Sequence, residues 1–156
     1  MLDKKRFRCA LQLEVRSHEI DWQGIVHNAV YLLYFETGRV AYLRARGVEI
    51  DGEAIRRQSL IVVARNEIDY RSPARFGEVL NLLTRISFIR NSSFTFEGIL
   101  EESLTGRLVA ENRSVHVWLD PRSHASRRVP EEFRQRVRAF EGENVAMESP
   151  TYFACF

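Results

Sequence analysis

An acid, a glycine and the start of a helix follow one another in the stretch DWQGIVHN, residues 21–28. Asp21 supplies a carboxylate, and Gly24 lets the chain turn tightly before a helix that begins near Asn28. The unpaired N–H groups and the dipole at a helix N-terminus stabilise negative charge. The spacing therefore predicts a site for developing negative charge at the helix start, attacked by the loop acid. The competing interpretation is a solvated loop in which Asp21 only caps a turn.

The helix that must position this site is predicted from Asn28 to about Arg46, roughly 19 residues. Its apolar residues fall in one stripe, which we expect to be buried: Ala29, Leu32, Leu33, Val40 and Leu43. Asn28, or His27 beside it, is the expected N-cap, and Gly47 the C-cap. Glu36 falls near the middle of the apolar stripe, where a carboxylate must find a partner or shift its pKa.

Most of the remaining chain has the composition and alternation of β-strands. The predicted strands cover residues 7–15, 60–71, 79–89, 94–100 and 107–119, and Pro130 opens a short helix over 131–140. Because short turns separate the last four strands, we expect them to form an antiparallel meander. One long helix laid on one antiparallel sheet predicts an α+β domain.

Length and composition favour a single soluble domain. The chain has 156 residues, of which 45% are hydrophobic and 28% charged, and a net charge of +2. We expect the domain to cover residues 1–140, followed by a tail of unassigned structure, 141–156. Cys9 and Cys155 lack metal or redox spacing and are interpreted as free thiols. With no secretory signal, membrane span or nucleic-acid signature, the sequence predicts a cytoplasmic protein.

The opening stretch also fits a family pattern, D-x-x-G-x-V-x-N-x-x-Y-x-x-x-x-E-x-x-R. The matching residues are Asp21, Gly24, Val26, Asn28, Tyr31, Glu36 and Arg39. With the later stretches IDYRSPARFGEVL and VPEEFRQRV, this pattern resembles the 4-hydroxybenzoyl-CoA thioesterase-like family, which includes the Tol–Pal-associated acyl-CoA thioesterases. The resemblance covers about residues 7–140. It implies the hotdog fold, an antiparallel β-sheet wrapped around one long central helix.

The resemblance also implies roles for individual residues. The Asn28 backbone N–H would polarise the thioester carbonyl, Asp21 would be nucleophile or general base, and Gly24 and His27 would complete the catalytic turn. Glu36 is the alternative acid, or it pairs with Arg39 three residues on. Residues assigned to substrate binding are Tyr31, Glu36, Arg90, Asn91, Ser92 and Ser93. The last four lie where relatives meet the nucleotide end of CoA.

The implied activity is hydrolysis of a fatty-acyl- or aroyl-CoA to free acid and CoA. No cofactor or metal site is expected, because the histidines have no ligand spacing and the serine-hydrolase, zinc and nucleotide motifs are absent. Relatives form homodimers or homotetramers with active sites between subunits, so the same is expected here. Three alternatives stay open: an acyl-carrier-protein thioesterase docking through Arg127–Arg138, a non-catalytic acyl-CoA-binding module, and a dehydratase, for which His27 and Glu36 are poorly arranged.

Overall fold

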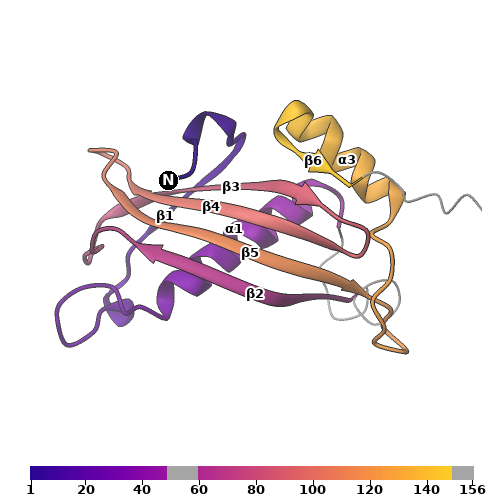
Figure 1. Ribbon diagram of the computed structural model, residues 1–156. Coiled ribbons are helices and arrows are strands. Elements are labelled where there is room, and N and C mark those ends of the chain that lie inside the picture. The colour runs from indigo at the N-terminus through magenta and orange to yellow at the C-terminus, as the bar shows by residue number, and fades with distance from the viewer. Residues whose placement is uncertain (49–59, 149–156) are drawn as a thin grey trace, which may run out of the picture.

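The computed structural model describes residues 1–48 and 60–148, and Cys155 lies outside the described residues. Within these residues one sheet contains β1 (Cys9–Glu14), β2 (Leu60–Tyr70), β3 (Val79–Ile89), β4 (Ser93–Glu102), β5 (Leu108–Leu119) and β6 (Ala146–Met147). The α-helices are α1 (Val30–Ala45) and α3 (Glu131–Glu141). Short 3-10 turns are η1 (Lys4–Arg6), η2 (Ser17–Glu19) and η3 (Gly142–Asn144). α1 lies across one face of the sheet (Figure 1). The predicted antiparallel sheet with a helix is confirmed.

The order of strands differs from the predicted meander. The sheet runs β1-β3-β4-β5-β2, so β3, β4 and β5 are consecutive antiparallel neighbours, but β2 pairs with β5 and not with β3. The eight residues 71–78 between β2 and β3 are long enough to cross the ends of β5 and β4, about 14 Å. This connection begins where Arg71 N–H and Ser72 N–H both donate to Val109 O, at 2.9 and 3.1 Å. The prediction that β2 and β3 are neighbours was wrong, because their short connection crosses two strands.

α1 is shorter than predicted, and it buries a different face. It has 16 residues, and its buried residues are Tyr31, Tyr34, Phe35, Gly38, Arg39, Tyr42 and Leu43. Of the predicted apolar stripe only Leu43 is buried, whereas Leu32 and Leu33 are 39% and 59% exposed. Glu36 is exposed too, so its predicted place inside a buried stripe is wrong. The aromatic face is buried in place of the leucine face because aromatic rings remove more apolar area from water.

Two glycines allow α1 to approach the sheet closely enough to bury that face. A Cβ on Gly38 would lie 2.9 Å from Leu82 Cδ2, and closer still to the side chain of Thr84. A Cβ on Gly98 of β4 would lie 2.7 and 2.8 Å from two ring carbons of Phe35. Since real Cβ contacts do not come that close, both positions require glycine for this helix–sheet distance.

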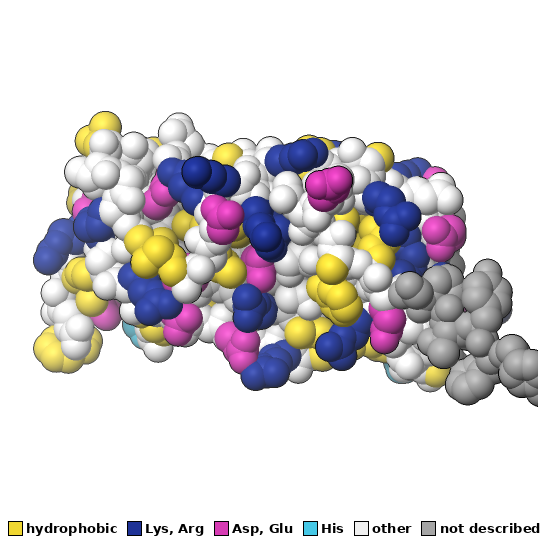
Figure 2. All heavy atoms as spheres, turned by 45° about the horizontal axis from the view of Figure 1, so that its top comes forward, with side chains coloured by type: hydrophobic (Ala, Val, Ile, Leu, Met, Phe, Trp, Pro, Cys, Tyr) yellow, Lys and Arg dark blue, Asp and Glu magenta, His cyan; other side chains and the backbone are white. Residues whose placement is uncertain are grey.

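The opposite face of the sheet is charged. Because Gly98 faces α1, its neighbour Glu97 points the other way, where it pairs with Arg85 at 2.7 Å and Arg113 at 2.9 Å. Figure 2 shows basic and acidic side chains interspersed on the visible surface, with small hydrophobic areas between them. No large region of one sign appears there, in keeping with the small net charge of +2.

Residues 141–148, which have no assignable period in the sequence, pack against the sheet. Glu141, the last residue of α3, is fully buried and accepts hydrogen bonds from the Tyr42 hydroxyl (2.7 Å) and the Ile86 N–H (3.3 Å). β6 then pairs in parallel with the end of β3, Ala146 opposite Phe88. The rest of the predicted tail, 149–156, lies outside the described residues. Across the described ranges, no helix combines the length and apolar character required to span a membrane.

Candidate active site

The loop before α1 is a hydrogen-bonded turn that presents Asp21. The Asp21 N–H donates to Ile25 O at 2.9 Å, and the Gly24 N–H donates back to Asp21 O at 3.0 Å. Gly24 has a φ of +76°, in the left-handed region that favours glycine. One carboxylate oxygen of Asp21, Oδ1, accepts from Gln23 N–H at 2.8 Å, and the described residues leave Oδ2 without a partner. The half-buried acid is thus held by its backbone with one oxygen open.

Ala29 is the N-cap of α1 and receives no side-chain capping hydrogen bond, so the predicted cap at Asn28 or His27 is wrong, and His27 instead holds the turn before the helix. Its Nδ1 accepts from Ala29 N–H at 3.1 Å, and its carbonyl accepts from Val30 N–H at 2.9 Å. Because Nδ1 is an acceptor, the proton of the neutral imidazole lies on Nε2. The Asn28 N–H has no acceptor among the described residues, and the residue is exposed. Asn28 therefore offers an unpaired backbone donor at the positive end of α1, as an oxyanion site requires.

Two buried contacts fix this loop against the domain. The Val26 N–H donates to Ala74 O at 2.9 Å, and Val26 is only 2% exposed. The Ala74 N–H in turn donates to the Tyr31 hydroxyl at 3.2 Å. Tyr31, predicted to bind substrate, is 3% exposed and packs edge-on against the half-exposed ring of Tyr70. Its place in the structure is beneath the loop, where it supports the connection between β2 and β3.

Glu19 is a supporting residue whose role sequence reasoning missed. It is 5% exposed and accepts hydrogen bonds from the Tyr34 hydroxyl (2.6 Å), Arg16 N–H (2.7 Å) and Arg16 Nη2 (2.9 Å). Burial alone would raise the pKa of Glu19, but these hydrogen bonds outweigh it and hold the pKa below its usual range. Its carbonyl accepts from His27 N–H at 2.9 Å. No capping signature in the sequence pointed to Glu19, because the N-cap position holds Arg16, whose side chain cannot accept a hydrogen bond.

Glu36 lies on the outward side of α1, eight residues after Asn28 and so about 12 Å farther along the helix. Within one chain it is not brought to the Asp21 loop. Its neighbour Arg39 is 7% exposed, and Nη1 of Arg39 is buried without an acceptor among the described residues. Burial lowers the pKa of Arg39, and the negative charge of Glu36 partly opposes that effect.

The predicted CoA-binding turn forms at the other end of the sheet. Arg90, Asn91, Ser92 and Ser93 join β3 to β4, and Arg90 N–H donates to Ser93 O at 2.8 Å. The 11 residues of β3 separate this turn from the Asp21 loop by about 30 Å. Figure 1 places the start of α1 and the tip of β3 at opposite ends of the molecule. One chain therefore does not bring the two predicted groups of residues together.

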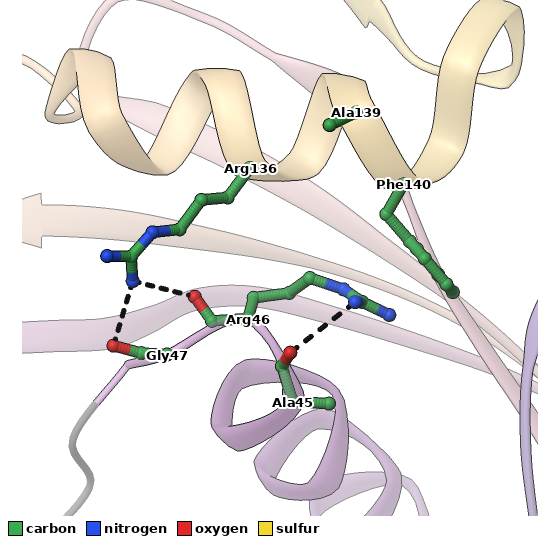
Figure 3. A pocket seen from close by; sticks show the side chains of 6 residues that line it. All are labelled: Ala45, Arg46, Gly47, Arg136, Ala139 and Phe140. Carbon is green, nitrogen blue, oxygen red and sulfur yellow. Dashed lines mark hydrogen bonds between the residues drawn. The ribbon is translucent and has the colours of Figure 1, made fainter.

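A hollow of about 580 Å³ lies at the C-terminal end of α1, and Figure 3 shows the residues that line it. Arg136 of α3 reaches across it, where Nη1 donates to Arg46 O at 3.0 Å and to Gly47 O at 3.1 Å. These contacts satisfy carbonyls that the helix end leaves unpaired. The Arg46 guanidinium lies 3.2 Å from the centre of the Phe140 ring. The described lining holds no carboxylate, so the acid and the open N–H remain together only at the other end of α1.

Residues 1–48 and 60–148 contain no group of three or more His, Cys, Asp or Glu side chains placed to hold an ion. What the loop can supply is a carboxylate and a backbone donor, the two groups needed for acyl transfer to water.

Comparison with known proteins shows which proteins the chain is similar to. The chloroplastic acyl-acyl carrier protein thioesterase ATL3 of Arabidopsis thaliana is 28% identical over 126 residues, covering 81% of this chain but 65% of its own length. The putative acyl-CoA thioesterase YneP of Bacillus subtilis is 30% identical over 72% of this chain and 80% of its own. The matched part of this chain thus covers slightly less than two thirds of the length of ATL3, and a larger share of the length of YneP.

A solved structure of a thioesterase is also similar to this chain in sequence and in fold. A thioesterase from Thermus thermophilus, crystallised with coenzyme A and Zn, is 30% identical and superposes with a TM-score of 0.75, over 88% of this chain and 97% of its own. The family model for the thioesterase-like superfamily matches residues 15–137, most of the domain and all of the Asp21–Asn28 loop. This chain belongs to the thioesterase-like superfamily.

Proposed function

We propose that the protein hydrolyses an acyl-CoA thioester to a free acid and CoA. One observation carries the proposal: the Asn28 N–H at the start of α1 has no acceptor among the described residues, and Asp21 stands in the same hydrogen-bonded loop. The donor suits an oxyanion, and the acid suits attack on the same carbonyl. Relatives named as acyl-CoA thioesterases, among them YneP, support this substrate class.

Two routes use these groups. In the nucleophilic route, Asp21 Oδ2 bonds to the carbonyl carbon, CoA leaves as a thiolate that takes up a proton, and water hydrolyses the resulting anhydride. In the general-base route, Asp21 takes a proton from water as the water attacks, and the departing thiolate receives a proton in turn. The Asn28 N–H stabilises the oxyanion in both. Gly24 and His27 shape the turn, and Glu36 is the alternative acid.

We propose further that two copies of the chain build each site. Arg90, Asn91, Ser92 and Ser93 would bind the nucleotide end of CoA, yet they lie about 30 Å from Asp21 within one chain. A second subunit would bring its own turn to the first subunit's loop. The unpaired outer edge of β2 and the exposed side chains of Leu33 and Val63 support such an interface. In that assembly α1 would become the central helix of a hotdog dimer or tetramer.

We propose a cytoplasmic location on the basis of cysteine chemistry. Cys9 is a half-buried free thiol, which suits a reducing environment. We therefore propose the cytoplasm as the compartment. The thioesterase domain predicted over residues 1–140 would extend to include Glu141 and β6, which pack against the sheet.

The test measures thiol release from short, long and aromatic acyl-CoAs. We expect turnover by the wild type, and a loss of about 10³-fold or more in Asp21→Asn, since the variant keeps the shape of the acid but not its charge. Glu36→Gln is the matched control and should retain most activity. Full activity in Asp21→Asn combined with loss in Glu36→Gln would transfer the catalytic role to Glu36. Sedimentation of the wild type as a monomer under assay conditions would exclude a site between subunits.

A carrier-protein substrate is the second candidate. ATL3 is named an acyl-acyl carrier protein thioesterase, and the segment Arg127–Arg138 offers basic side chains for an acidic carrier. Release of acid from acyl carrier protein, without release from any acyl-CoA, would select this alternative. Binding of CoA thioesters with no turnover of either substrate would indicate a non-catalytic module.

A further inference from the structure

The connection between β2 and β3 is hydrogen-bonded to the active-site loop through Ala74. Ala74 is fully buried; its carbonyl accepts from Val26 N–H at 2.9 Å, and its N–H donates to the Tyr31 hydroxyl at 3.2 Å. Val26 precedes Asn28 by two residues. The position of Ala74 therefore helps to set where the open N–H of Asn28 lies.

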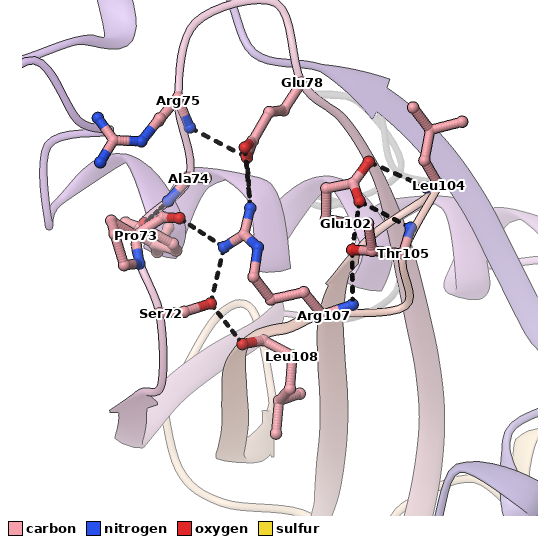
Figure 4. A network of polar contacts seen from close by, with 11 residues as sticks. Ser72, Pro73, Ala74, Arg75, Glu78, Glu102, Leu104, Thr105, Arg107 and Leu108 are labelled. Atoms are coloured by element: carbon pink, nitrogen blue, oxygen red, sulfur yellow. Dashed lines mark hydrogen bonds and ion pairs between the residues drawn. The ribbon is translucent and has the colours of Figure 1, made fainter.

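Arg107, just before β5, holds this connection from the other side (Figure 4). Its Nη1 donates to Pro73 O at 2.6 Å and to Ser72 Oγ at 2.8 Å. Its Nη2 donates to both carboxylate oxygens of Glu78, at 2.9 and 2.8 Å. The fork of one guanidinium thus ties together the start and the end of the connection, residues 72 and 78.

The carbonyl of Pro73 and the N–H of Ala74 belong to one peptide bond, which is planar. Arg107 donates a hydrogen bond to the carbonyl of this peptide group, and the N–H of the group donates one to the Tyr31 hydroxyl. With both ends held, the plane has little freedom to rotate. The direction of the following carbonyl, to which Val26 donates, is then restricted as well.

We propose that Arg107 is a positioning residue for the hydrolysis proposed above: it fixes the Pro73–Ala74 peptide and, through Val26, the Asn28 N–H. The inference rests on that proposed function. The Arg107–Glu78 ion pair is too exposed, at 34% and 25% of its side chains, to contribute much to stability by charge alone. Its main effect is on geometry, and a displacement of about 1 Å at a reacting group can cost about 100-fold in rate.

The first experiment compares two arginine-to-methionine variants. Arg107→Met keeps the aliphatic stem and removes the fork, so kcat on acyl-CoA should fall about 10- to 100-fold with KM changed less than about twofold. Arg113→Met is the matched control, because Arg113 also donates through two guanidinium nitrogens to a glutamate, Glu97, on the face of the sheet away from α1. Its kcat should stay within about twofold of the wild type. Arg107→Lys should recover part of the lost kcat.

The second experiment needs no turnover, so it separates this inference from the proposed function. Amide hydrogen exchange should become faster at Val26 and in the 20–28 loop of Arg107→Met, and stay unchanged there in Arg113→Met. If the wild type hydrolyses no thioester, this comparison still decides the role of Arg107. Wild-type exchange at Val26 in folded Arg107→Met overturns the inference. Should that variant fail to fold, wild-type kcat and wild-type exchange in Arg107→Lys overturn it equally.

Discussion

His116 is a buried base that the fold keeps neutral, and its protonation should make stability depend on pH. The residue is 5% exposed, stacks on the Phe94 ring with centroids 5.6 Å apart, and places Nε2 3.0 Å from Ser114 Oγ. Burial, and then the positive charge of Arg39, lowers the pKa of His116 to about 4. In the unfolded chain both effects are absent, and the pKa returns to about 6.5.

The sign and size of the effect follow from these two pKa values. Between pH 6.5 and pH 4 the unfolded chain binds a proton that the folded chain does not, so the free energy of unfolding falls as the pH falls. Each pKa unit corresponds to about 1.4 kcal/mol, which gives about 3 kcal/mol for the whole interval. About 2 kcal/mol of this should be lost between pH 7 and pH 4.5.

Urea unfolding at pH 7 and pH 4.5 measures this loss in the wild type and in His116→Gln, which keeps a polar group beside Ser114. Carboxylates titrate alike in both proteins, so the difference between the two losses isolates His116. We expect His116→Gln to lose about 2 kcal/mol less than the wild type on acidification. His124→Gln, at an exposed loop histidine, should behave as the wild type. Equal losses in His116→Gln and the wild type would refute the buried neutral state.

Three further predictions concern the packing and polar contacts around α1. Gly98→Ala should lower the free energy of unfolding by about 1–3 kcal/mol in urea titrations, because the new Cβ meets the Phe35 ring; an unchanged midpoint would contradict the close approach. Tyr34→Phe should lower the free energy of unfolding by about 1.5–3 kcal/mol, because the 2.6 Å hydrogen bond to Glu19 is lost. A loss under about 0.5 kcal/mol would argue against that bond. Burial raises the pKa of Glu141, so above the unfolded pKa of about 4.5 this carboxyl should oppose the gain in stability that His116 gives with rising pH. Between pH 5 and pH 8, Glu141→Gln should therefore gain more stability than the wild type. Parallel unfolding titrations at pH 5 and pH 8 test this, and equal pH slopes would speak against it.

The local parts of the fold were predictable from the sequence. Strands appear as alternation of apolar and polar residues, and the turn before α1 appears as Gly24 between an acid and a helix start, because both signals lie within a few neighbouring residues. The occurrence of Asp21 and Asn28 in one loop is likewise local, since a stretch of eight residues contains both. For the same reason the family pattern around this loop identifies the superfamily.

Features that depend on distant contacts were not predictable. The leucine stripe of α1 is as regular as its aromatic face, and the aromatic face is buried because Gly38 meets β3 and Phe35 meets Gly98 across the sheet. That choice exposes Glu36 and buries Arg39. A helix has two sides with similar local periodicity, so the tertiary contacts decide which one packs.

The sequence by itself determined the strands, the helix, the loop acid and the family, because each of these depends on residues that are close together along the chain. Only the tertiary structure decided that β2 lies beside β5, that Tyr31 supports the loop from within the core, and that Arg107 reaches Pro73. These contacts join residues more than 30 positions apart, at 31 and 74 or 73 and 107. Their geometry follows from how the sheet closes around α1, which no local pattern of residues contains.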